Sequence, residues 1–175
     1  MKRLRDREFA VIGLGRFGSG VALTLETHGY QVLGLDHDTE IVQRLSDRIT
    51  HMAVLDSTDE EALKAVDITA VDTVVVAIGN DFEANLLTTV ALKNLGVKQI
   101  VCKAPTRRQM QILMKVGADR VIQPEFDAGR RLAEELSTPA ILERISLGPQ
   151  HSIAELIVPS DMVYQSLMQV DLRNK

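Results

Sequence analysis

The most constraining feature of the sequence is a glycine-rich hexapeptide, Gly13-Leu14-Gly15-Arg16-Phe17-Gly18, between a short apolar run and a helical pattern. Residues 9–12 before it are typical of a buried strand. Gly13 permits a tight turn, Gly15 lets the backbone approach a phosphate closely, and Gly18 lets the helix pack against the strand. The free N–H groups at the start of that helix then face the phosphates, so the hexapeptide predicts a nucleotide site.

A single acidic residue, Asp36, ends the next apolar run, eighteen residues after Gly18. A carboxylate at this position accepts hydrogen bonds from both ribose hydroxyls and repels a 2′-phosphate, which favours NAD(H) or adenine nucleotides over NADP(H). His37 beside it is a candidate ribose contact, although its position is more typical of a surface histidine. Helix capping is the alternative for Asp36, but Asp38 is better placed to cap the following helix.

Apolar runs alternate with helical patterns through the first 123 residues. This alternation predicts βαβ units and an α/β fold, a Rossmann-like doubly wound parallel sheet of six strands in the order 3-2-1-4-5-6. The expected strands are residues 9–12, 31–35, 51–55, 73–78, 99–102 and 120–122. The expected helices lie near residues 17–28, 39–47, 59–66, 82–95 and 107–116.

The pattern changes after Pro124. Residues 125–136 are expected to form a helix with an apolar face, and residues 140–145 a second, short helix. We expect this helical hairpin to pack on a second copy of the chain, or alternatively on its own sheet. Residues 153–158 predict a strand, and residues 162–170 the start of a helix. The apolar face comprises Phe126, Leu132, Ala133 and Leu136.

Three regions are therefore predicted. Residues 1–124 form the nucleotide-binding domain, residues 125–148 the helical hairpin for dimerisation, and residues 149–175 the beginning of a small C-terminal lobe that is truncated here. About 25 residues cannot build a core of their own.

Composition excludes several classes of partner. The net charge of −4 and the pI of about 5.6 argue against a large nucleic-acid or anionic-membrane surface. No apolar run approaches the roughly 18 residues that span a bilayer, so a membrane role is expected to come through a partner. The single cysteine, Cys102, lies in an apolar run and fits a core position in a cytoplasmic protein.

Further candidate ligands follow the third predicted strand. Asp56 and Ser57 could contact the edge of an adenine. The alternative is capping of the next helix through Ser57 or Thr58, with Glu61 completing a capping box after Thr58.

Other candidates surround the expected phosphates. Ile78 and Gly79 follow the fourth strand, across the switch point from the glycine loop, where backbone lines the ribose and phosphates. Lys103 ends the fifth strand and is either a phosphate contact or a solvated lysine. Arg16 is either a charge-assisted contact to a terminal phosphate or a surface arginine.

The search for catalytic residues is negative. The four histidines are scattered without metal-ligand spacing, and no Walker, G-x-S-x-G or Y-x-x-x-K motif occurs. A nucleotide site without chemical groups predicts sensing rather than turnover. The rival hypotheses are an NAD-dependent oxidoreductase, or the cofactor domain of one, and a nucleotide-sensing transcriptional regulator.

Four segments resemble one known family: residues 9–18, 55–60, 75–79 and 117–125, the last reading GADRVIQPE. They are similar to the RCK (KTN, TrkA-N) domains of potassium uptake systems, and the resemblance covers essentially the whole chain. It implies dimers joined through the hairpin, a ring that is usually octameric, and docking under a membrane subunit. ATP and ADP would change the ring shape and so the gating.

The resemblance also implies roles for two residues. Arg16 would meet the terminal phosphates, and Glu125 would lie near the γ-phosphate across the dimer interface and help hold a divalent cation, Mg²⁺ or Ca²⁺. The alternative for Glu125 is a first-turn acid of the helix that follows Pro124. The chain is thus expected to be a cytosolic, ATP/ADP- or NAD(H)-sensing subunit at the inner membrane face. Its partner would be a KtrB/TrkH-like potassium-translocating subunit.

Overall fold

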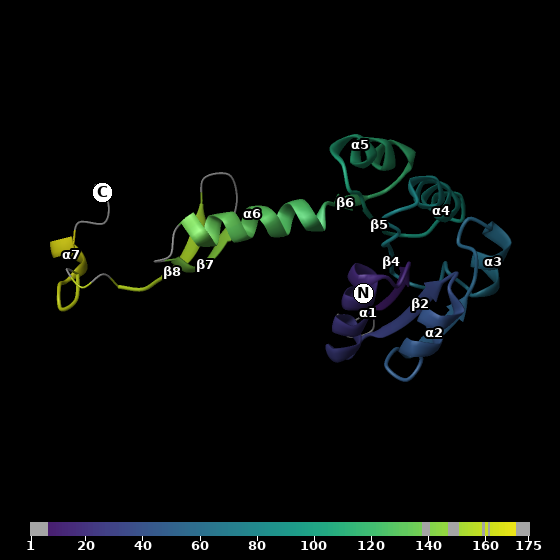
Figure 1. The fold of residues 1–175 in the computed structure, drawn as a ribbon, viewed down its shortest axis with the longest axis horizontal. Coiled ribbons are helices and arrows are strands. Elements are labelled where there is room, and N and C mark those ends of the chain that lie inside the picture. Colours follow the sequence, from purple (N-terminus) through teal and green to yellow (C-terminus); the bar gives the residue numbers. More distant parts are fainter. Residues whose placement is uncertain (1–6, 138–140, 147–150, 159, 161, 171–175) are drawn as a thin grey trace. The chain divides into compact units, whose positions relative to one another are not determined.

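The computed structural model describes residues 7–137, 141–146, 151–158, 160 and 162–170. The chain divides into two compact units, Met1–Pro124 and Glu125–Lys175, and each is described by itself (Figure 1).

The first unit is built on one sheet of six parallel strands in the order β3-β2-β1-β4-β5-β6, which confirms the predicted topology. The order reverses between β1 and β4, so their carboxyl ends flank the switch point where ligands bind in such sheets. Ile12 at the end of β1 pairs with Leu35 on one side and Val76 on the other. The strands are β1 (Glu8–Ile12), β2 (Gln31–Asp36), β3 (His51–Val54), β4 (Thr73–Val76), β5 (Ile100–Lys103) and β6 (Arg120–Ile122).

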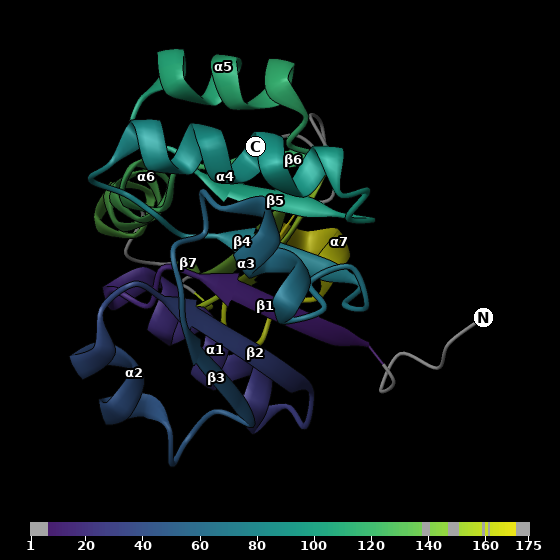
Figure 2. The same cartoon turned by 90° about the vertical axis from the view of Figure 1, so that its right-hand side faces the viewer.

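Helices cover both faces of this sheet (Figure 2). One buried cluster contains Leu63, Leu92 and Leu113 from α3, α4 and α5, and the other contains Ala22 and Leu45 from α1 and α2. The sheet is therefore apolar on both sides, as a doubly wound fold requires. The helices are α1 (Arg16–Thr27), α2 (Thr39–Leu45), α3 (Glu60–Ala65), α4 (Phe82–Asn94) and α5 (Arg107–Val116).

Side-chain caps fix where four of these helices begin. Asp38, Asp59, Asp81 and Thr106 each accept a hydrogen bond from a backbone N–H in the first turn of α2, α3, α4 and α5. Such a cap stabilises a helix by about 1 kcal/mol. The predicted capping role of Asp38 is confirmed.

The second unit contains α6 (Pro124–Ser137), the antiparallel pair β7 (Ile141–Ser146) and β8 (Ser152–Leu156), and α7 (Leu167–Val170). The predicted helix over residues 140–145 is wrong, since residues 141–146 form β7. A helix of six residues is marginally stable, because the free energy needed to nucleate its first turn exceeds the stabilisation from its few hydrogen bonds. A strand with β-branched residues instead gains a ladder with β8, in which Ile145 pairs with Ile153.

The remaining expectations for the second unit hold in part. The helix predicted over residues 125–136 is found as α6, and the strand predicted over 153–158 as β8. The final helix, α7, is shorter than expected. Within the described part of the chain, every helix is too short or too polar to traverse a bilayer.

Cys102 lies fully buried in β5, and burial raises the pKa of its thiol to about 11. We expect it to react very slowly with a thiol reagent at pH 8 in the native protein and rapidly in denaturant, because the thiolate is the reactive form. The unfolded thiol loses its proton at lower pH than the folded one, so Cys102 should lower the stability as the pH rises from about 9 to 11. The absorbance of the released reagent, followed at pH 8 with and without denaturant, measures the labelling rate of Cys102. Fast labelling of the native protein would contradict the predicted protection of the thiol.

Candidate nucleotide site

The glycine loop joins β1 to α1 by an unusually close backbone approach. Gly13 has a φ of +85° and donates its N–H to the Leu35 carbonyl at 2.8 Å. A Cβ built on Gly18 would lie 1.9 Å from the Gly13 carbonyl oxygen, and one on Gly13 would lie 3.1 Å from the Ile78 nitrogen. Gly13 and Gly18 are therefore required, because a side chain at either position would overlap neighbouring backbone atoms.

The start of α1 differs from that of the other helices in the sheet unit. Its N-cap is Gly15, which offers no side-chain hydrogen bond, and its first turn contains no acidic residue. A Cβ on Gly15 would meet nothing within 4 Å, so the backbone is open to an approaching group. The N–H groups of the first turn and the positive end of the helix dipole are thus available to an anion.

Asp36 links the end of β2 to this loop. Its Oδ2 accepts from the Leu14 N–H at 2.6 Å and its Oδ1 from the Asp38 N–H at 3.0 Å, and the residue is only 6% exposed. A carboxylate oxygen accepts more than one hydrogen bond, so ribose binding by Asp36 stays a prediction. His37 lies alongside, its Nδ1 3.3 Å from Asp36 Oδ1, with its side chain 88% exposed.

The predicted adenine contacts after β3 have different surroundings. Asp56 is exposed, and hydrogen bonds from the Thr58 N–H and hydroxyl lower the pKa of its carboxyl. Ser57 is buried, and its hydroxyl shares a 2.8 Å hydrogen bond with Thr88 of α4. The alternative that Ser57 or Thr58 caps α3 is wrong, because Asp59 performs that role.

Lys103 brings the end of β5 to the glycine loop. Its side chain passes over Gly79, where a Cβ would lie 3.2 Å from the lysine Nζ. The same Nζ lies 5.8 Å from the centre of the Phe17 ring, within range of a cation–π contact. The carboxyl end of β4, the carboxyl end of β5 and the first turn of α1 therefore meet at one place, with a cation among them.

The two residues assigned by resemblance lie in different units. Arg16 is exposed at the first position of α1 in the sheet unit. Glu125 is exposed in the first turn of α6 in the second unit. The described residues contain no group of three metal-ligating side chains, so a cation would also need oxygens from a ligand or another copy.

Residues 9–124 match the TrkA-N domain family over most of the sheet unit. The chain belongs to the TrkA-N domain family. Among its relatives, Ktr system potassium uptake protein C of Bacillus subtilis (strain 168) is 37% identical over 169 residues, which cover 97% of this chain and 76% of that protein. Ktr system potassium uptake protein A of the same organism is 37% identical over 175 residues, or 100% of this chain and 79% of that one.

Solved structures share the fold of this TrkA-N chain at low identity. The GsuK channel bound to NAD superposes with a TM-score of 0.65 at 22% identity, covering 85% of this chain and 28% of that one. The structure of GsuK bound to ADP gives a TM-score of 0.67 at 12% identity, covering 94% and 50%.

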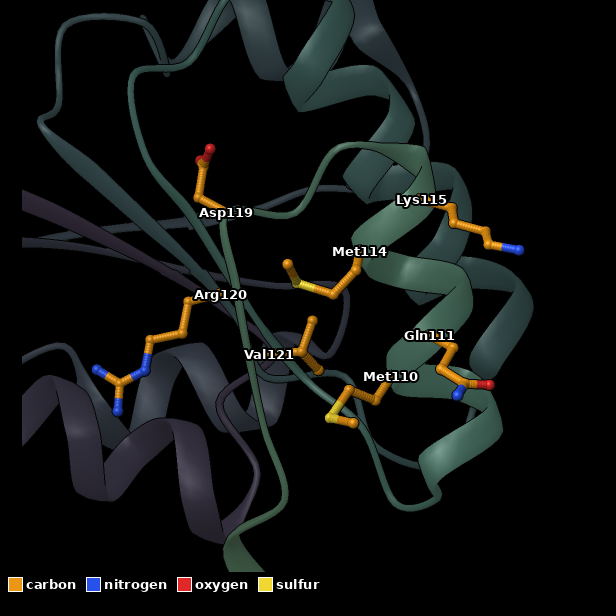
Figure 3. A pocket seen from close by; sticks show the side chains of 7 residues that line it. All are labelled: Met110, Gln111, Met114, Lys115, Asp119, Arg120 and Val121. Atoms are coloured by element: carbon orange, nitrogen blue, oxygen red, sulfur yellow. The ribbon is translucent and has the colours of Figure 1, made fainter. Parts of the chain in front are cut away.

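A pocket of the TrkA-N sheet unit lies elsewhere. It measures about 670 Å³ and is formed by α5 and β6, with Met110, Met114 and Val121 directed toward one another and Lys115 and Gln111 directed outward (Figure 3). None of its lining residues belongs to the candidate nucleotide site. Because its centre is apolar and no polar groups converge on it, we place no nucleotide there.

Sequence reasoning missed one residue at the nucleotide site. Asn85 in α4 is buried, and its amide contacts the carbonyl oxygens of Ile78 and Lys103. The available signal was polarity on the buried face of a helix, since Asn85, Thr88 and Thr89 fall at or near one helical turn apart. That spacing alone names no partner, because the partners are distant in sequence.

The contact at Gly18 predicts opposite effects for two substitutions in one helix. Gly18→Ala should lower the free energy of unfolding by about 2–3 kcal/mol, because the new methyl group overlaps backbone. Gly20→Ala is the matched control: its Cβ meets nothing within 4 Å, so it should stabilise α1 by about 0.5–1 kcal/mol. Urea denaturation measures both, and equal effects would show that the close approach is absent.

Proposed function

We propose that this chain is a nucleotide-sensing regulatory subunit of a potassium uptake system, with ATP and ADP as first ligands and NAD(H) as the alternative. The observation that carries the proposal is the uncapped first turn of α1, held next to the buried Asp36 by the Leu14 N–H. Phosphates suit the helix start, and the carboxylate suits ribose hydroxyls. The names of the Bacillus relatives supply the potassium uptake context.

In this proposal the protein binds its nucleotide and does not transform it. The groups gathered at the carboxyl edge, with Asp36 and Lys103 foremost, are of the kind that hold a ribose and phosphates. The competing function is an NAD-dependent oxidoreductase. Steady NADH consumption with carbonyl substrates, lost in Gly15→Val, would favour that alternative.

Regulation would depend on the terminal phosphate. A ligand shifts a conformational equilibrium only through contacts that differ between the two states. ATP and ADP differ by one phosphoryl group, and Arg16, together with Glu125 of a neighbouring copy acting through Mg²⁺ or Ca²⁺, would contact it. Carboxylate and phosphate oxygens are suitable ligands for these cations.

The proposed assembly is a homodimer that forms a ring, an octamer by family resemblance, below a KtrB/TrkH-like membrane subunit. The apolar side chains of α6 support this: Phe126, Leu132 and Leu136 are 67%, 54% and 73% exposed. An apolar helix face of this kind gains free energy when another surface covers it. The chain would act at the cytoplasmic face of the membrane through its partner, without inserting.

Calorimetry with ATP, ADP, NAD and NADH, with and without Mg²⁺, tests the proposed ligand. We expect adenine nucleotides to bind, and Asp36→Ala to weaken binding by about 1.5–3 kcal/mol, since hydrogen bonds to a charged group are lost. Asp38→Ala is the control, because it removes the side-chain cap of α2 but keeps the Asp38 backbone N–H that donates to Asp36 and leaves the Asp36 carboxylate in place.

Two outcomes of this calorimetry distinguish an error in the proposed ligand from an error in the proposed role of Asp36. Binding of no nucleotide to the native chain would contradict the proposed function. Equal affinities for the native protein and Asp36→Ala would remove Asp36 from the site while leaving nucleotide binding intact.

The apolar face of α6 predicts an assembly defect. Leu132→Asp should shift the sedimentation coefficient toward the monomer, because a carboxylate buried in an apolar interface is costly. Arg131→Asp places the same acid on the opposite side of the helix and should leave assembly unchanged. If both variants sediment like the native protein, α6 does not form the interface.

A further inference from the structure

One buried side chain, Asn85 in the first turns of α4, joins the segments that follow β4 and β5. Its Nδ2 donates to the Ile78 carbonyl at 2.6 Å and to the Lys103 carbonyl at 3.0 Å. Backbone pairing of the two strands reaches Val76 and Cys102. The amide therefore connects the two chains at the point where their regular pairing ends.

The orientation of this amide follows from its neighbours. Both are carbonyl oxygens, which only accept hydrogen bonds, so the nitrogen and not the oxygen of Asn85 must face them. Its Oδ1 is then the one buried side-chain polar atom without a partner among the residues that the structure describes. An unsatisfied buried acceptor lowers stability, so the position favours a functional reason for asparagine over a purely structural one.

Both carbonyls that Asn85 holds belong to residues in contact with the glycine loop. The peptide of Ile78 lies against Gly13, where a Cβ would be 3.1 Å from the Ile78 nitrogen. The Lys103 side chain passes over Gly79 toward the Phe17 ring. Release of the amide would free both segments from the place where phosphates are expected.

We propose that Asn85 is a positioning residue for the phosphate end of the nucleotide. At 1% exposure it cannot touch a ligand itself, and it acts by holding the backbone of Ile78 and Lys103 against the glycine loop. This inference rests on the proposed function, since it places a nucleotide phosphate beside Lys103. Its signature is a loss of affinity that grows with the number of phosphates.

The test compares Asn85→Leu with Thr89→Val. Leucine has a similar size and removes both the donors and the unsatisfied oxygen. Thr89 is buried one turn later, where its hydroxyl bonds to the Asn85 carbonyl and to the Cys102 sulfur, so Thr89→Val disturbs the same helix away from the loops. Asn85→Ser, too short to reach both carbonyls, is a second and milder variant.

Calorimetry with ATP, ADP and AMP gives the first measurement. We expect the Kd of Asn85→Leu for ATP to rise about tenfold, as for the loss of about one positioned hydrogen bond, with a smaller rise for ADP and the smallest for AMP. Thr89→Val should leave the ratio of ATP to AMP affinity unchanged. Equal weakening of all three nucleotides by Asn85→Leu would reduce Asn85 to fold support and overturn the proposal.

Amide hydrogen exchange without ligand gives the second measurement. Residues 77–81 and 103–106 should exchange faster in Asn85→Leu than in the native protein or Thr89→Val. Unchanged exchange there would overturn the proposal whatever the protein binds. If the native chain binds no nucleotide, the proposed function and the phosphate role both fail, while faster exchange would still show that Asn85 joins the two segments.

Discussion

The contact between the Gly13 carbonyl and Gly18 is the constraint on which the site depends. Because no Cβ fits between them, the first turn of α1 can lie directly against the end of β1. That approach puts the backbone N–H groups of α1 at the switch point between β1 and β4, where the sheet order reverses. Asp36 from β2 and Lys103 from β5 contact this loop, whose position is fixed by the close approach of Gly13 and Gly18.

The site is held mainly by side chains that bond to backbone. Asp36 accepts from Leu14, and Asn85 donates to Ile78 and Lys103. Such bonds set the positions of loops whose own backbone groups have no ladder to pair with. The strand ends and these side-chain hydrogen bonds together preorganise the site. A bound ligand therefore loses less free energy to the ordering of loops.

Local pattern predicted the six strands, their order and the cap at Asp38, because periodicity and capping depend on residues near in sequence. It failed where the deciding partner is distant. Residues 141–146 have a spacing that suits a helix or a strand, and the pairing with β8 decides between them. The hydroxyl of Ser57 bonds to Thr88 and the amide of Asn85 to Lys103, and neither partner can be found from local spacing.

The uncapped start of α1 has a practical consequence. Where α2 to α5 have an aspartate or threonine in the chain, α1 has only solvent or a bound anion to accept its first N–H groups. A nucleotide would therefore complete a helix as well as fill a site. Sulfate or inorganic phosphate can accept hydrogen bonds from the same N–H groups. A buffer that contains these anions would therefore compete with a nucleotide and lower its apparent affinity.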